Sequence, residues 1–368
     1  QAFRVLYPMS PTILRHEDKI YSVQLAGEFA DDYGGPYRES FDGYCGEIQS
    51  SIMSLMCQTP NGRHVTGINR EKWLLNPGAK SHTEIKMLAF FGKLMGVAIR
   101  SKGYLPLNIP LFIWKLIVGE RPTLKDLEDI DQPLVRNFLH DFRNIHETMD
   151  EEAFNVTFYE TFTTIGTDGA EVELVRNGAD KNVTFENRNE YCDLVENFRL
   201  HEFDKQAAAV RAGLGTVVPA GALNLLTGSE LEILVCGNPE IDLELLKSCT
   251  EYRSCQSNSQ HVQFFWQAME SFNTEERQAF IRFVWGRSRL PLTAAGFSSQ
   301  FRIQGFGQSP ADAYFPVAHT CFFSFELPAY STLEIMKEKL LYAIFNCVAI
   351  DGDDTGAGVN AANMGWEE

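Results

Sequence analysis

A stretch near the C-terminus, residues 313 to 331, constrains this chain more than any other. Its centre reads Ala-His-Thr-Cys-Phe-Phe, and an apolar, aromatic run follows Cys321 until the Leu-Pro-Ala-Tyr of residues 327–330 stops it. That run predicts a strand, so Thr320 and Cys321 would lie in a tight loop that feeds it. A packed strand fixes the position of a neighbouring sulfur, as a reactive cysteine requires. The alternative is a buried, inert cysteine, which is the commoner fate of a free thiol.

Length and composition indicate a globular protein of two domains. The 368 residues exceed the usual size of one core, and the 44% hydrophobic content is far from that of a disordered chain. No apolar run reaches the ~18 residues of a membrane span, and the N-terminus does not resemble a secretory signal. The start at Gln1 predicts a fragment or a processed piece. Eight scattered cysteines suit a reducing compartment, the cytoplasm or the nucleus.

The charge and the scattered potential ligands exclude several kinds of site. A formal net charge of −17 argues against nucleic acid, whose phosphates need basic patches, and favours basic partners through steering. Solubility alone is the other reason for such acidity. The closest cysteines, Cys249 and Cys255, lack zinc spacing. Residues 351–356 begin like a calcium loop, but Ala362 stands where the loop needs a bidentate Glu. We therefore predict no metal site.

Apolar periodicity predicts a mixture of helices and short strands. The clearest helix spans residues 84–100, whose apolar side chains recur mostly every third residue. Gly92 and Gly96 lie within it and favour close packing against another helix. Further helices are expected at 36–56, 134–145, 187–198, 230–234, 261–271, 274–284 and 332–347, and strands at 21–25, 154–164, 171–176 and 250–252.

The cysteine segment resembles the active-site segment of the HECT family of ubiquitin ligases. The family pattern is roughly Leu-Pro-x-x-x-Thr-Cys-Phe followed by Leu-x-Leu-Pro-x-Tyr. Phe315 and Phe325 replace two of the family's leucines and keep an apolar side chain. The Cys-Phe-Phe variant suggests the large HERC-like branch. The matching residues are Pro316, Thr320, Cys321, Phe322, Leu327, Pro328 and Tyr330.

Other motifs resemble the same family in the same order, so the resemblance covers about residues 20–351. They are a Gly-Gly-x-x-Arg-Glu segment at 34–39, the helix at 90–98, and the turn at 283–291, in which Trp285 stands where the family often has Thr. The resemblance implies an α+β bilobal HECT domain whose C-lobe carries the catalytic cysteine. Its expected parts are an N-lobe at 1–236 with a small subdomain at about 124–205, a hinge at 237–240 that includes Gly237, Asn238 and Pro239, a C-lobe at 241–351 and a flexible tail at 352–368.

In this family the small subdomain binds the ubiquitin-conjugating enzyme (E2). Six positions would contact that enzyme when the chain is aligned on the family's motifs. All are apolar or aromatic, as an exposed groove for a partner requires, and ordinary core packing is the alternative for each. These positions are Val135, Leu139, Ile145, Phe154, Val156 and Tyr191.

The resemblance also implies the reaction. Cys321 would attack the thioester between ubiquitin and the conjugating enzyme, and a lysine of a protein substrate would then attack the new thioester to give an isopeptide bond. A thiolate suits both steps, and neither step needs a metal or an organic cofactor. His319 and Thr320 beside the cysteine are the further residues that we predict for the catalytic site. The predicted supporting residues are Arg289, the late apolar Ile350, and Asp351 or Asp353 as a group that orients or deprotonates the lysine.

His319 also allows a dyad with the cysteine, because positions 319 and 321 share one face of an extended segment. Simple turn stabilisation is the alternative for Arg289 and Thr320. Two other functions stay open. A cysteine hydrolase would need a separate His and Asn or Asp partner, whose family signature is missing. A catalytically inactive HECT-like binding or scaffold module would leave Cys321 inert.

Overall fold

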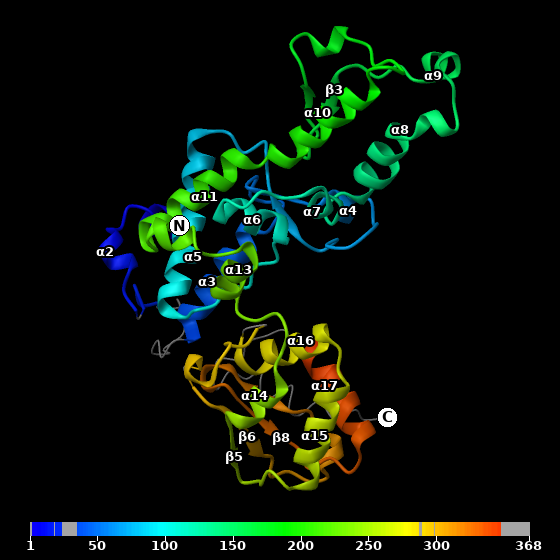
Figure 1. Cartoon of the computed structure of the whole chain (residues 1–368). Coiled ribbons are helices and arrows are strands. Elements are labelled where there is room, and N and C mark those ends of the chain that lie inside the picture. The colour runs from blue at the N-terminus through cyan, green and yellow to red at the C-terminus, as the bar shows by residue number, and fades with distance from the viewer. Residues whose placement is uncertain (1, 18, 24–34, 287–288, 298, 347–368) are drawn as a thin grey trace. The chain divides into compact units, whose positions relative to one another are not determined.

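The computed structural model describes residues 2–17, 19–23, 35–286, 289–297 and 299–346. The chain forms two compact units, each described here by itself (Figure 1). The first unit comprises Gln1–His16, Tyr44–Arg100 and Leu107–Val235, and the second comprises Glu17–Gly43, Ser101–Pro106 and Cys236–Glu368. Helix α3 (Gly35–Ile48) contributes to both.

The first unit is built around two helices in backbone contact. Helix α5 (His82–Ser101) matches the predicted helix at 84–100, and α11 (Asp204–Val217) crosses it. A Cβ on Gly92 would lie 1.9 Å from the carbonyl oxygen of Val210, and one on Gly213 would lie 1.7 Å from that of Ala89. Only glycine allows this approach, so the prediction of close packing is confirmed. The other elements of this body are α1 (Ala2–Leu6), α2 (Pro11–Leu14), the antiparallel strands β1 (Met56–Gln58) and β2 (Trp73–Leu75), α4 (Pro60–Arg63), α6 (Leu111–Val118), α12 (Ala220–Leu223) and α13 (Gly228–Cys236).

Two N-terminal predictions are wrong. Helix α3 ends at Ile48 instead of reaching Met56, which begins β1. The side chain of Ser50 donates to the carbonyl oxygen of Glu47 at 2.6 Å and so competes with the bond that a continuing helix would make. Residues 21–23 form no strand, and the last two residues of the predicted strand at 21–25 lie outside the described part of the chain.

The small subdomain, residues 124–205 of the first unit, has a core of its own. Aromatic side chains dominate this core, with Phe142, Phe154 and Phe162 buried beside Tyr191. Its longest helices are α10 and a continuous helix that begins with one wide π-type segment. The elements are α7 (Leu124–Glu128), the π segment η1 (Pro133–His140) continued by α8 (Asp141–Arg143), η2 (Ile145–Glu147), α9 (Glu151–Thr157), the hairpin strands β3 (Thr163–Ile165) and β4 (Glu171–Glu173), η3 (Gly178–Asp180) and α10 (Arg188–His201).

The strand predicted at 154–164 is largely wrong, because Phe154 lies in helix α9. The side chain of Asp150 accepts a hydrogen bond from the amide of Ala153 at 2.9 Å, and acidic residues fill the first turn. Both features stabilise a helix N-terminus. The ring of Phe154 then packs against that of Phe158, the residue that follows the helix, with ring centroids 4.9 Å apart. Only the end of the predicted segment, from Thr163, becomes strand β3.

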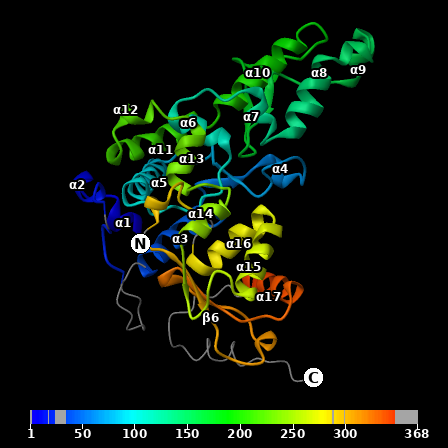
Figure 2. The ribbon, with the colours of Figure 1, turned by 60° about the horizontal axis from the view of Figure 1, so that its bottom comes forward.

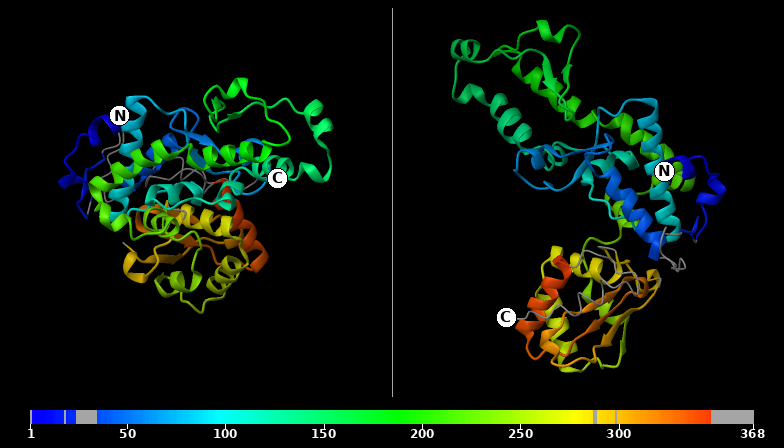
Figure 3. Two further views of the ribbon diagram at one scale, coloured as in Figure 1. Left: turned by 45° about the horizontal axis from the view of Figure 1, so that its top comes forward. Right: turned by 180° about the vertical axis from the view of Figure 1, so that it is seen from behind.

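The second unit is a four-stranded sheet packed against helices, with the strand order β5-β6-β8-β7. Strands β5, β6 and β8 are parallel, whereas β7 runs antiparallel to β8. Phe325 of β8 lies against Phe265 and Phe280. These two residues belong to the helices at 260–271 and 274–285, which pack on the sheet (Figure 2, Figure 3). The mixture confirms the predicted α+β class. The elements are α14 (Leu243–Ser248), β5 (Thr250–Arg253), α15 (Gln260–Ser271), α16 (Thr274–Trp285), η4 (Ala294–Gly296), β6 (Phe301–Gly305), η5 (Ala311–Ala313), β7 (Val317–His319), η6 (Thr320–Phe322), β8 (Ser324–Leu327) and α17 (Leu333–Asn346).

Across the part of the chain that the structure describes, no helix combines the length and the apolar character that a membrane span needs.

Candidate active site

The cysteine segment is a tight turn between two strands of the sheet in the second unit. Strand β7 ends at His319, residues 320–322 form the 3-10 turn η6, and β8 starts at Ser324. Cys321 is the middle residue of this turn. The amide of Phe323 donates to the carbonyl oxygen of Thr320 at 3.4 Å and closes the turn. The predicted loop that feeds a strand is therefore confirmed.

Phe323 anchors the turn to the core. Its backbone lies in the left-handed region at φ +48°, a strained position for a side chain of this size, and its ring is fully buried. The ring stacks on Trp285 with centroids 4.2 Å apart and lies 4.9 Å from Phe301. Aromatic burial on this scale offsets the backbone strain. The sequence did not predict this anchor, although Trp285, at a position where the family often has Thr, was a signal for it.

Exposed aromatic side chains flank the turn along the chain. Phe322 directly follows Cys321 and is 52% exposed. Phe315, before β7, stacks on Tyr342 of helix α17 with centroids 4.8 Å apart, and Lys339 lies 4.2 Å from the centre of the Phe315 ring. Tyr342 is 48% exposed. Phe315 and Phe322 are motif residues, but the sequence did not indicate Tyr342 or Lys339, because their contacts with Phe315 depend on the fold.

His319 contacts a carboxylate of the neighbouring strand. Its Nε2 lies 3.2 Å from Oε1 of Glu326, and both side chains are about 30% exposed. The predicted dyad assumed an extended segment, but the backbone turns at Thr320, so the argument that His319 and Cys321 share a strand face is wrong. His319 pairs with Glu326 beside the turn, and its contact with Cys321 stays a prediction. Ile350, Asp351 and Asp353, which were predicted as supporting residues, lie outside the described residues.

The predicted hinge residues are hydrogen-bonded within the second unit. Gly237 has φ +84°, and its carbonyl oxygen accepts from Arg289 at 3.2 Å. The amide of Asn238 donates to the carbonyl oxygen of Leu290 at 3.1 Å, and Gln278 donates to that of Pro239 at 2.8 Å. Arg289, which we expected to position the active-site loop, thus holds the carbonyl of Gly237 in this structure.

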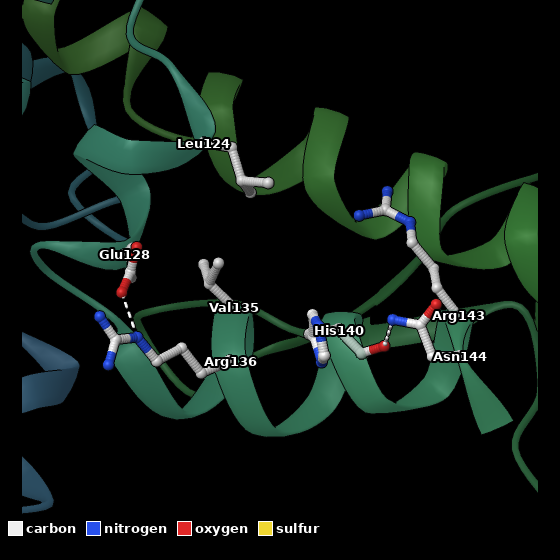
Figure 4. A pocket seen from close by; sticks show the side chains of 7 residues that line it. All are labelled: Leu124, Glu128, Val135, Arg136, His140, Arg143 and Asn144. Atoms are coloured by element: carbon white, nitrogen blue, oxygen red, sulfur yellow. Dashed lines mark hydrogen bonds and ion pairs between the residues drawn. The ribbon is translucent and has the colours of Figure 1, made fainter. Parts of the chain in front are cut away.

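The six predicted contact positions of the small subdomain fall into two groups. Leu139 and Phe154 are fully buried and Tyr191 is 5% exposed, so these three side chains belong to its core. Val156 is 67% exposed, and Ile145 is half-buried beside the same core. Val135 lines a cavity of about 510 Å³ (Figure 4). The other residues that line this cavity are Leu124, Glu128, Arg136, His140, Arg143 and Asn144.

Polar groups shape the walls of this cavity, and the sequence analysis did not identify them. Arg136 pairs with Glu128, and Arg143 reaches both Asp193 and Glu196 of helix α10 at 2.8 Å (Figure 4 shows the first pair). Burial opposes the charge of Arg143, but Glu196 and Asp193 raise its pKa above the ordinary value. The cavity therefore presents an apolar floor between charged edges.

Other thiols of the chain are poorly suited to nucleophilic chemistry. Burial raises the pKa of Cys57 to about 12 and that of Cys192 to about 11, and it also raises the pKa of Cys255. Such thiols carry almost no thiolate at neutral pH. Among the residues that the structure describes, no cluster of three or more His, Cys, Asp or Glu side chains could hold a metal ion.

Comparisons with known proteins place this geometry in a family. The HECT-domain (ubiquitin-transferase) family matches residues 45–350. Mouse and human E3 ubiquitin-protein ligase HERC2 are each 41% identical over 94% of the chain, which spans only 7% of their length. Human probable E3 ubiquitin-protein ligase HECTD4 is 33% identical over 88% of the chain and 9% of its own length. The similarity to HERC2 agrees with the expected HERC-like branch, and the chain belongs to the HECT-domain (ubiquitin-transferase) family.

Proposed function

We propose that this chain is the catalytic domain of an E3 ubiquitin ligase that carries ubiquitin as a thioester on Cys321 and transfers it to a substrate lysine. The observation that carries the proposal is the position of Cys321. It lies in a turn anchored to the sheet by Phe323, within the segment that matches the HECT-domain family. A rigid anchor supports a nucleophile that must meet two different partners in turn.

The chemistry consists of two acyl transfers. In the first, the Cys321 thiolate attacks the carbonyl carbon of the thioester on the conjugating enzyme, whose own thiolate leaves. In the second, a neutral lysine amine attacks the carbonyl carbon of the new thioester, an isopeptide bond forms and Cys321 leaves as a thiolate. The attacking amine must lose a proton. His319 beside Glu326 is a neighbouring pair that can accept or guide it.

The conjugating enzyme would bind the small subdomain. Val135, Ile145 and Val156 reach the surface or line the cavity, so they supply contacts, whereas Leu139, Phe154 and Tyr191 hold the contact surface from below. Ubiquitin and protein substrates are the other partners. The scattered cysteines support a reducing compartment, the cytoplasm or the nucleus, as the place of the reaction.

An assay of ubiquitin transfer with purified conjugating enzymes tests the proposal. The Cys321→Ala variant should lose transfer completely while its affinity for the conjugating enzyme stays unchanged. Cys255→Ala is the matched control, because it removes another thiol of the second unit. If Cys321→Ala still transfers ubiquitin, the proposed nucleophile is wrong. If the unaltered chain binds conjugating enzymes but transfers nothing, it is a binding or scaffold module.

A further inference from the structure

A buried ionic cluster ties together three chain segments at the base of the small subdomain, where the subdomain continues into the rest of the first unit. Its centre is Arg199 of helix α10, whose side chain is 5% exposed. Nη2 of Arg199 lies 2.8 Å from Asp131 Oδ2 and donates to the hydroxyl of Thr167 at 3.0 Å, while Nε lies 2.8 Å from Glu202 Oε1. Glu202 also accepts from the amide of Thr167 at 2.9 Å and from its hydroxyl at 2.6 Å. The four residues therefore form one closed network.

The four members of the cluster come from three different connections of the chain. Asp131 immediately precedes the helix that starts at Pro133, and its Oδ1 accepts from the amide of Leu134 at 3.1 Å. Arg199 and Glu202 lie at the C-terminal end of α10, and Thr167 lies in the turn of the β3–β4 hairpin. The guanidinium of Arg199 therefore contacts a residue from each of the three connections.

Neighbouring polar side chains attach these connections to the body. Asn61 of α4 is fully buried, accepts from the amide of Gln132 at 2.7 Å and donates to the carbonyl oxygen of Asp129 at 3.1 Å. Gln206, in the first turn of α11, donates to the carbonyl oxygen of Pro77 at 2.9 Å. The cluster therefore lies at the neck, which is the end of the small subdomain that these bonds attach to the body.

The chemistry of the cluster favours a directional role over a purely stabilising one. The attraction within a buried ion pair barely offsets the free-energy cost of removing both charges from water, and a protein with apolar residues in their place is often equally stable. A guanidinium, however, donates along fixed directions in its plane, so it holds its partners at set angles. Burial opposes the charge of Arg199, but Glu202 and Asp131 raise its pKa, so the fork stays fully protonated.

The exposed part of the predicted contact surface lies away from the neck. Val156 belongs to α9, which sits at the end of the small subdomain far from α11 and α4 (Figure 1, Figure 2). A small rotation at the neck would therefore become a larger displacement at α9. Acyl transfer is sensitive to such displacement, since a misplacement of about 1 Å can cost on the order of 100-fold in rate.

We propose that the Asp131–Arg199–Glu202–Thr167 cluster is a clamp that fixes the angle at which the small subdomain presents a charged conjugating enzyme. Arg199 and Thr167 are positioning residues for ubiquitin transfer. This inference rests on the proposed function. It extends the proposed function by giving two tasks to two regions. The surface of the subdomain binds the conjugating enzyme, and the clamp sets the orientation of that enzyme.

Two conservative variants test the clamp. Arg199→Lys keeps the positive charge but loses the planar set of guanidinium donors. Thr167→Val removes only the hydroxyl through which the hairpin contacts Arg199 and Glu202. The second variant stays informative if the first folds poorly. Arg211→Lys is the matched control, because Arg211 donates to the carbonyl oxygen of Ile117 at 2.6 Å within the body. Each protein is measured for its Kd for a conjugating enzyme, its single-turnover rate of thioester formation at saturating charged enzyme, and its peptide-resolved hydrogen exchange.

The clamp predicts a Kd within about twofold of the unaltered chain, a saturated rate lower on the order of 10-fold or more, and faster exchange at the neck peptides around 131–135 and 164–168. Exchange across residues 188–195 of the subdomain core stays unchanged. Two results would overturn the clamp: an unchanged rate of thioester formation at saturating charged enzyme, or a slower rate that is seen only below saturation. Absence of thioester in the unaltered chain would instead overturn the proposed function, so the two failures are distinguishable.

Discussion

The cysteine turn of the second unit and the small subdomain of the first are held in place by opposite means. The turn is fixed by apolar packing, because Phe323 lies between Trp285 and Phe301 in a core of aromatic rings. The neck of the subdomain is fixed by charge, because Arg199 binds two buried carboxylates. Apolar contacts are not directional, whereas the N–H groups of a guanidinium donate hydrogen bonds along fixed directions in its plane. The difference suggests that the turn needs a stable position and the subdomain needs a defined angle.

The largest effect should come from removing the aromatic anchor. Phe323→Ala should lower the free energy of unfolding by about 5 kcal/mol, because it empties a fully buried site whose ring neighbours are Trp285 and Phe301. Phe322→Ala is the control: this ring is 52% exposed and should cost less than about 1 kcal/mol. Urea denaturation of both variants gives the comparison. Equal losses would mean that apolar packing does not anchor the turn.

A smaller effect should separate the two groups of contact positions in the subdomain. Leu139→Ala should cost about 3 kcal/mol in unfolding free energy, because its side chain is fully buried in the core. Val156→Ala should leave stability within about 0.5 kcal/mol, since the side chain is 67% exposed, and weaken binding of a conjugating enzyme several-fold. Calorimetry and a binding titration measure both. A stable Leu139→Ala variant with weakened binding would restore Leu139 as a direct contact.

The smallest change in stability should come from the pair beside the cysteine. Glu326→Gln should alter the unfolding free energy by less than about 1 kcal/mol, because both partners are partly exposed. If the pair guides the proton of the attacking lysine, discharge of the thioester to free lysine should slow several-fold. Discharge to hydroxylamine, which is largely unprotonated near neutral pH, should not slow. Equal slowing with both nucleophiles would indicate a purely structural role.

Local patterns predicted much of the fold. Periodicity predicted α5, α15 and α17, and the Asn273 capping box marked the start of α16, where the carboxylate of Glu276 accepts from the amide of Asn273 at 2.8 Å. The strand after Cys321 is also where its composition indicated. These elements depend on neighbours within a few residues. Short aromatic runs were less decisive, since Phe154 suits a strand as well as a helix face and the cap at Asp150 decided the outcome.

The site depended on contacts that are distant in sequence. Glu326 and Phe323 act through partners that only the sheet and its helices bring near. The sequence contains one indication of the clamp. Arg199 follows the apolar residues Tyr191 and Val195 at intervals of four on α10, so it lies on the same helix face. A charged residue on a buried helix face needs a partner. Glu202, three residues further on, is one such partner, but the sequence could not name Asp131 and Thr167, since they are more than thirty residues away.

The most direct test of the account is the trapping of ubiquitin on Cys321. The chain is mixed with a ubiquitin-charged conjugating enzyme, and the products are separated on a non-reducing gel and measured by intact mass. The account predicts a species heavier by one ubiquitin that disappears with reductant and is lost in Cys321→Ala but not in Cys255→Ala. If no such species forms with several conjugating enzymes, or if it persists in Cys321→Ala, the central claim is contradicted.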